Sequence, residues 1–207
     1  MAIDAGTDAL GLVTAMPSGA GVITDDVAAS IALMTPPGVD TFLLTCRRDA
    51  YSVVEQHRSI RTTTIQLVAR VELRELARIR DALPGVRLVQ VIHVQGEVSL
   101  RMAQSVVGHV DAVLLDSGHP TATTKELGGT GRRHDWSISR RIRETLNIPV
   151  FLAGGLTPGN VGQAVREVGP YGIDVCSGLR VDGSLDGHLL IEFFRSARHF
   201  SGPSDPV

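Results

Sequence analysis

Short apolar runs alternate along the whole chain with segments in which apolar residues recur at helical spacing. The apolar runs are rich in Val, Ile and Leu, which favours buried β-strands. They cover Ala9–Val13, Thr41–Thr45, Thr64–Val68, Leu88–Val94, Ala112–Asp116, Val150–Ala153 and Gly172–Ser177. Because these runs are almost continuously apolar, they predict a parallel sheet whose faces are covered by helices.

The segments between the runs predict amphipathic helices. These segments are Asp25–Met34, Asp49–His57, Glu72–Leu83, Glu97–Val107, Ser137–Leu146, Pro158–Val168 and Asp186–Arg198. Thr24 and Asp49 are suitable N-cap residues, and two acidic residues follow Thr24 in the first turn of its helix. Pro158 suits the first turn of the helix that it begins.

A (β/α)8 barrel needs eight parallel strands to close, so seven such units do not complete one. Seven strands are also more than an open doubly wound sheet usually has. The opening residues MAIDAG resemble the end of a helix that leads into the strand at Ala9. We therefore expect an α/β fold, a TIM (β/α)8-type barrel with seven recognisable βα units and its first unit absent or truncated. On this interpretation about 30 residues would precede Met1.

The chain contains no linker-like or repeated segment, so we expect residues 1–200 to form a single barrel-type domain and residues 201–207 to be a disordered tail. A missing strand would leave two unpaired sheet edges beside an apolar core. The chain would then be less stable than a closed barrel and prone to associate through the gap, as a homo-oligomer.

Composition narrows the range of possible functions. A chain of 207 residues that is 43% hydrophobic, with a net charge of −2, can bury one sizeable core. It has no apolar run long enough to cross a membrane and no signal peptide at its N-terminus. Cys46 and Cys176 suit free thiols in a reducing compartment, so we expect a cytoplasmic protein. Dispersed basic residues and few aromatic side chains give no sign of nucleic-acid binding.

Two glycine-containing turns follow the last two predicted strands. Gly154 and Gly155 come directly after one strand, and Ser177 and Gly178 end the other. Backbone N–H groups in such turns can converge on a phosphate, and barrels commonly bind phosphate after their last two strands. A tight strand–helix connection alone would explain one glycine turn. Two consecutive turns favour a phosphate-binding site.

Asp116 ends its strand and faces a glycine-rich loop, which suits a general acid. It could also simply cap that loop. His93 ends the preceding strand and could reach the same end of the barrel, although a hydrogen-bonded structural histidine is an equal alternative. His134 lies near a helix start, where a structural role is favoured.

The segments LLDSG…KELGGTGRRHDW, VFLAGGLTPGNV and GIDVCSGLRVDG resemble the last three units of the phosphoribosylanthranilate isomerases of tryptophan biosynthesis. The resemblance implies an eight-stranded barrel and a cofactor-free Amadori (aldose–ketose) rearrangement of N-(5'-phosphoribosyl)anthranilate. It implies that Asp116 is the general acid and that Gly154, Gly155, Ser177 and Gly178 bind the phosphate. It also implies that the loop containing Gly128 and Gly129 closes over the substrate.

The chain departs from this family in several places, one of which is the strand at Gln66-Leu67, where Val68 replaces the histidine that is usual in the family. Family members carry a general-base cysteine on their first strand, and no matching motif is present here. They also carry an arginine after the second strand that holds the anthranilate carboxylate. The corresponding segment AMPSGAGVI, residues 15–23, has no basic residue. Arg180, finally, stands where an acidic residue is frequent.

These departures leave several hypotheses open. One hypothesis is that the start codon is assigned late or the chain is truncated, so that the first strand is missing. The other is that the protein is a divergent paralogue that has lost the general-base cysteine. Cys176, which neighbours the phosphate turn, is a candidate replacement for that base, although a buried structural thiol is the commoner case. The leading function is the isomerase. The alternatives are a non-catalytic phosphosugar-binding barrel and an enzyme for another small phosphorylated substrate.

No group of His, Cys or Asp has the spacing of metal ligands, and GGTGRRHDW lacks the strand and helix that flank a nicotinamide-binding motif. We therefore expect neither a metal nor an organic cofactor. The expected partner is a small phosphorylated substrate.

Overall fold

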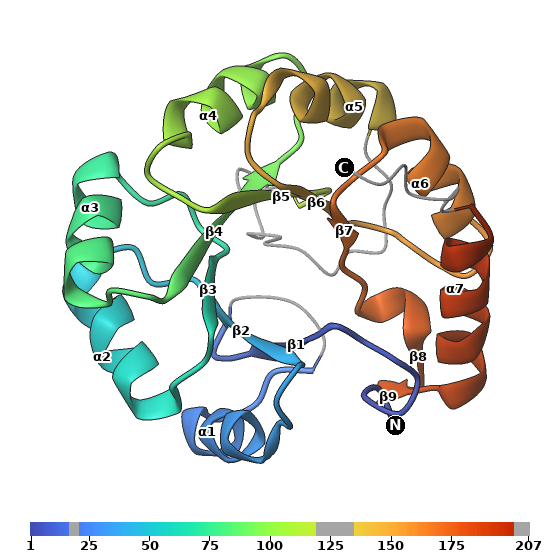
Figure 1. The fold of residues 1–207 in the computed structure, drawn as a ribbon, viewed down its shortest axis with the longest axis horizontal. Coiled ribbons are helices and arrows are strands. Elements are labelled where there is room, and N and C mark those ends of the chain that lie inside the picture. Colours follow the sequence, from blue (N-terminus) through green and yellow to red (C-terminus); the bar gives the residue numbers. More distant parts are fainter. Residues whose placement is uncertain (17–20, 119–134, 201–207) are drawn as a thin grey trace.

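In the computed structural model, residues 1–16, 21–118 and 135–200 are described, and the side chains of residues 199 and 200 are not. In these parts of the chain, seven parallel strands form one strongly curved sheet in sequence order, which Figure 1 shows end-on. The strands are β1 (Ala9–Val13), β2 (Asp40–Thr45), β3 (Thr64–Leu67), β4 (Arg87–His93), β5 (Ala112–Asp116), β6 (Val150–Leu152) and β7 (Gly172–Ile173). The predicted seven-unit barrel-type fold is confirmed.

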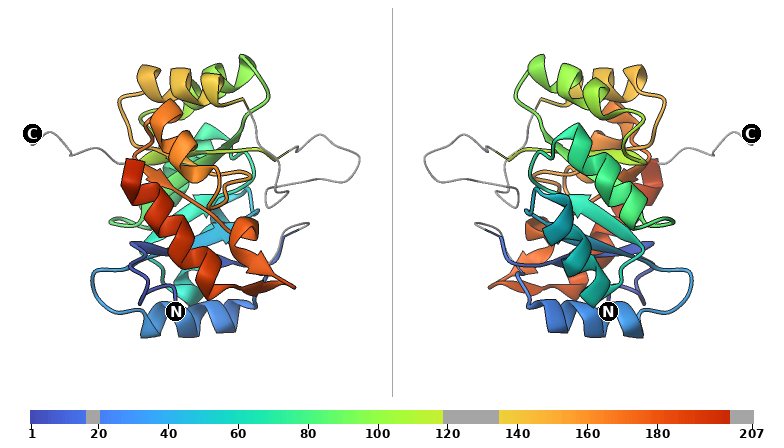
Figure 2. Two further views of the ribbon diagram at one scale, coloured as in Figure 1. Left: turned by 90° about the vertical axis from the view of Figure 1, so that its right-hand side faces the viewer. Right: turned by 90° about the vertical axis from the view of Figure 1, so that its left-hand side faces the viewer.

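Within the described residues, seven helices are present, and they surround the sheet on its outer side (Figures 1 and 2). They are α1 (Asp25–Met34), α2 (Ala50–Ile60), α3 (Leu73–Ala82), α4 (Val98–Val106), α5 (Trp136–Thr145), α6 (Val161–Val168) and α7 (Gly187–Phe200). Thr24 and Asp49 cap α1 and α2 as predicted, because their side chains accept hydrogen bonds from Val27 N and Ser52 N. All of these helices except α6 begin within one or two residues of the predicted position.

The prediction that Pro158 lies in the first turn of its helix is wrong. Helix α6 begins at Val161, and residues 158–160 form a separate turn before it. Asn160 stabilises that turn: its Oδ1 accepts a hydrogen bond from Thr157 N at 2.9 Å. The side chain of Asn160 thus adds to the backbone hydrogen bond from Asn160 N to Thr157 O, and the regular helix starts one residue later.

The core has two layers. Large aliphatic side chains on the outer face of the strands, such as Leu43, Ile65 and Leu115, are completely buried under the helices. A second cluster, which includes Val91 and Leu114, comes from alternate strand positions and faces the inside of the curved sheet. A curved parallel sheet with both faces filled in this way brings the carboxyl ends of its strands together.

The curved sheet does not close in the described part of the chain. Strands β1 and β7 are the two ends of the strand order, and the remaining gap is visible on the lower right of Figure 1. After β7 the chain forms a short 3-10 helix, Ser177–Leu179, and then an antiparallel hairpin of β8 (Arg180–Val181) and β9 (Ser184–Leu185). The hairpin and the N-terminal segment lie beside the gap (Figure 1).

The hairpin was not predicted. Its two turn residues, Asp182 and Gly183, both have positive φ, at 50° and 79°. This is the geometry of the tight two-residue turn that Asp-Gly favours. Strand β7 is also shorter than predicted, because the chain leaves the sheet after Ile173 and residues 177–179 turn into the 3-10 helix.

Candidate functional site

Asp116 is the last residue of β5 and lies at the carboxyl end of the sheet, with only 8% of its surface exposed. Its Oδ1 accepts a hydrogen bond from Ser117 N at 2.7 Å. Burial raises the pKa of this carboxyl above its ordinary value, and the Ser117 hydrogen bonds and the nearby His93 offset only part of that effect. A buried carboxyl with a raised pKa holds its proton more firmly than an exposed aspartate does, which suits a general acid.

His93 is placed next to Asp116 by the sheet. The two residues are register partners in the β4–β5 ladder, and both end their strands. His93 Nε2 lies 3.1 Å from the carbonyl oxygen of Val68. Because a carbonyl oxygen only accepts, this contact places a proton on Nε2. The ring is therefore held against the strand ends, beside the acid.

Asp174 is a second carboxyl at this end of the sheet, and it was not predicted as a site residue. Its backbone N–H donates to Leu152 O at 2.9 Å, which anchors it immediately after β7. Loss of solvent and the neighbouring charge of Asp116 raise the pKa of Asp174 to about 6. The two carboxyl groups therefore lie close enough for each to affect the ionisation of the other.

The turn after β6 packs directly on the acid. Gly154 and Gly155 have φ values of 83° and 65°, a region that side chains disfavour. A Cβ on Gly154 would lie 2.7 Å from Ser117 N and 2.9 Å from Asp116 Oδ1. Position 154 thus requires glycine for two reasons: its φ is positive, and a side chain there would collide with Asp116 and Ser117.

The two predicted phosphate turns contact each other. A Cβ on Gly178 would stand only 1.9 Å from the carbonyl oxygen of Leu156, the residue after Gly155. In the described part of the chain, the backbone N–H groups of Gly155, Leu156, Ser177 and Gly178 have no hydrogen-bond acceptor. Unsatisfied N–H groups in two adjoining turns are a suitable site for a phosphate.

Asn160 fixes the first of these turns. Its Oδ1 accepts from Thr157 N, and its Nδ2 donates to Gly155 O at 2.8 Å. These two bonds tie the end of the turn back to its beginning. The N–H groups of the turn are therefore held in place before any ligand arrives.

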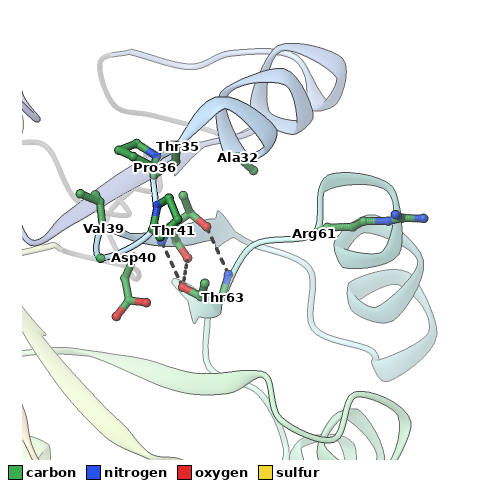
Figure 3. A pocket seen from close by; sticks show the side chains of 10 residues that line it. Ala32, Thr35, Pro36, Val39, Asp40, Thr41, Arg61 and Thr63 are labelled. Carbon is green, nitrogen blue, oxygen red and sulfur yellow. Dashed lines mark hydrogen bonds between the residues drawn. The ribbon is translucent and has the colours of Figure 1, made fainter.

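A cavity of about 430 Å³ occupies the gap between β1 and β7 and the inside of the curved sheet. Its lining is apolar on the strands, with Phe42, Leu114 and Phe151, and polar near the strand ends, with Asp174 and Arg180. A second hollow lies at the opposite, amino end of β2 and β3, around the hydrogen-bonded pair Thr41 and Thr63 (Figure 3). The first cavity runs along the gap from Asp8, at the amino end of β1, to Asp174 and Arg180, which follow β7.

Comparison with known proteins agrees with this geometry. The family model described as N-(5'-phosphoribosyl)anthranilate (PRA) isomerase matches residues 44–196, well over half of the chain. This chain belongs to the PRA isomerase family. The N-(5'-phosphoribosyl)anthranilate isomerase of Methanocella arvoryzae is 37% identical over 194 residues, which cover 93% of this chain and 89% of that protein.

Solved structures of PRA isomerases share the fold. The enzyme from Thermococcus kodakaraensis superposes with a TM-score of 0.75 at 28% identity, covering 94% of this chain and 89% of that one. A PRA isomerase in complex with reduced 1-(o-carboxyphenylamino)-1-deoxyribulose 5-phosphate gives a TM-score of 0.78 at 22% identity, covering 96% and 91%. At this identity the second likeness concerns the fold alone.

The structure brings Asp116, His93 and the two glycine turns together at one end of the sheet. Cys176 lines the cavity beside them, and Cys46 donates a weak hydrogen bond to Ala15 O from the end of β2. Gly128, Gly129 and His134 lie outside the described residues. Within the described residues, no group of three or more His, Cys, Asp or Glu could hold a metal ion, and no helix is long and apolar enough to span a membrane.

Proposed function

We propose that this chain isomerises N-(5'-phosphoribosyl)anthranilate to 1-(o-carboxyphenylamino)-1-deoxyribulose 5-phosphate, an Amadori rearrangement in tryptophan biosynthesis. The observation that carries the proposal is the contact between Asp116 and Gly154. It joins a buried carboxyl with a raised pKa to the first of two adjoining glycine turns. A phosphate held by those turns would place the attached ribose beside the acid.

In the first step, Asp116 donates its proton to the ring oxygen of the ribose. The bond between that oxygen and the anomeric carbon breaks, and the anilino nitrogen forms a double bond to the same carbon. A raised pKa is needed here, because an ionised Asp116 could not supply the proton. Removing this acid should slow the reaction by about 10² to 10⁴.

In the second step, a base removes the proton from the adjacent sugar carbon, which gives an enolamine that tautomerises to the ketose. Asp174 is the candidate for this role. With a pKa near 6 it is largely ionised at neutral pH, and it lies beside Asp116 in the same end of the barrel. Because the two carboxyls interact, they gain and lose protons as a pair, and we propose that the reactive form is the singly protonated pair with the proton on Asp116.

The cavity gives room for the rest of the substrate. Its apolar lining, which includes Phe151 from β6, suits an aromatic ring, and its polar end lies near the glycine turns. We expect the protein to work in the cytoplasm on this small substrate, without nucleic acid or a metal. Among the residues that the structure describes, the outer edges of β1 and β7 pair with no further strand, and such edges favour association into a homo-oligomer.

Genetic complementation tests the proposal. A bacterial strain that lacks its own PRA isomerase should grow without tryptophan when it expresses this chain, and should not grow when it expresses D116N at the same level. Failure of the unaltered chain to restore growth, despite soluble expression, would contradict the proposed function.

A further inference from the structure

The side chain of Arg180 crosses the gap between the two ends of the sheet. Arg180 is the first residue of β8, immediately beyond the 3-10 helix that follows β7. Its NH2 group lies only 2.7 Å from the position that a Cβ on Gly21 would occupy. Gly21 belongs to the segment that follows β1. The guanidinium therefore lies at the carboxyl end of the strands, between segments that follow β7 and β1.

This guanidinium is half-buried and has few partners. Its NH1 group donates to Gly183 O at 2.6 Å, across the hairpin turn. Its Nε is buried without a hydrogen-bond acceptor. None of the ion pairs found in the described residues includes Arg180, although Asp174 lines the same cavity. A partly buried cation without a counter-charge is unfavourable by itself and is stabilised by an anionic ligand.

The position of Arg180 distinguishes it from the phosphate turns. Gly178 packs on Leu156, which follows β6, whereas Arg180 reaches toward Gly21, which follows β1. The two anion-binding features thus lie on opposite sides of the chain that leaves β7. A ligand that binds both would need two anionic groups with a spacer between them.

We propose that Arg180 binds the carboxylate of the substrate's aromatic ring, while the glycine turns bind its phosphate. This inference rests on the proposed function and specifies how that site selects its substrate. A guanidinium is a permanent cation with several N–H donors, so its NH2 group can donate a charge-assisted hydrogen bond to a carboxylate oxygen. The apolar lining of the cavity then receives the ring between the two charged ends.

Calorimetric titration of two ligands tests the proposal. The first is reduced 1-(o-carboxyphenylamino)-1-deoxyribulose 5-phosphate, and the second is the same molecule without its carboxylate. The unaltered chain should bind the first about 10 to 100 times more tightly, as expected for a charge-assisted hydrogen-bonded pair. R180Q should lose this preference and bind the second ligand as the unaltered chain does, which also shows that the variant is folded.

R74Q is the matched control, because the side chain of Arg74 is 79% exposed and lies on α3. It should retain the full preference. Two results would overturn the role of Arg180 and leave the proposed function standing: an equal affinity of the unaltered chain for both ligands, or an unchanged preference in R180Q. If the unaltered chain binds neither ligand, both the role of Arg180 and the proposed function are wrong.

Discussion

The backbone of Gly178 lies so close to Leu156 that a Cβ on Gly178 would be 1.9 Å from the Leu156 carbonyl oxygen. This contact joins the turn after β6 to the turn after β7. It explains why glycine is present in the second turn even though its φ is not positive. The reason is the close packing of two backbones, and the N–H groups of both turns are brought together by it.

We therefore expect G178A to separate the two turns. The variant should lose about 1–3 kcal/mol of unfolding free energy, as overpacked sites do, and should bind the reduced phosphate-bearing ligand at least tenfold more weakly. Thermal unfolding and calorimetric titration measure the two effects. G159A is the control, because the nearest atom to a Cβ on Gly159 would be 3.9 Å away. Equal ligand affinity in both variants would show that the contact does not shape the site.

Asn160 offers a test of the turn's rigidity. In N160A, Thr157 N and Gly155 O would both lose their hydrogen-bond partner, at a cost of about 1–2 kcal/mol in stability. Ligand affinity should fall as well, since the N–H groups of the turn would no longer be held in position. The exposed Asn147 provides a control, N147A, that should leave both quantities unchanged. Retained affinity in N160A would mean that the turn is rigid without this side chain.

The pKa of Asp174 predicts a pH-dependent stability. Because the folded-state pKa is about 6 and the ordinary value is 3.8, folding favours the protonated form. The contribution of this group is fully present below about pH 4 and is lost as the pH rises through 6. D174N removes the cost of ionising a buried carboxyl in the folded state. The free energy of unfolding of D174N should therefore be close to that of the unaltered chain near pH 4 and about 2 kcal/mol higher at pH 7.5.

Chemical denaturation at several pH values would measure this difference. D186N is a useful comparison, since Asp186 accepts a hydrogen bond from Leu189 N at the start of α7 and its removal should destabilise the chain. A D174N variant that is less stable than the unaltered chain at pH 7.5 would contradict the assignment of a raised pKa to Asp174.

Much of the fold could be predicted from the pattern of apolar residues. The strands Ala9–Val13 and Ala112–Asp116 have the predicted bounds because each follows an aspartate and is a short, mainly apolar run. The helix Asp25–Met34 also has its predicted bounds, because Thr24 caps its start. The hairpin after β7 was missed because its strands have only two residues each. The dipeptide Asp182-Gly183 was the signal that could have predicted it.

The candidate site was partly predictable. Asp116 and the glycine turns stand out in the sequence because they end strands and precede helices. Asp174 does not, because it lies inside a run that reads as one apolar strand, and its importance depends on burial and on the neighbouring charge of Asp116. Arg180 was noted only as an unusual residue. Its contact with Gly21 joins segments at opposite ends of the sheet, which no local pattern reveals.

Turnover of N-(5'-phosphoribosyl)anthranilate, followed by the loss of its fluorescence, tests the central claim most directly. The unaltered chain should consume the substrate at neutral pH, and D116N should be slower by about 10² to 10⁴ while still binding the reduced product analogue. An unaltered chain that binds this analogue but turns over substrate no faster than D116N would contradict the account. The barrel would then be a phosphosugar-binding protein without the isomerase reaction.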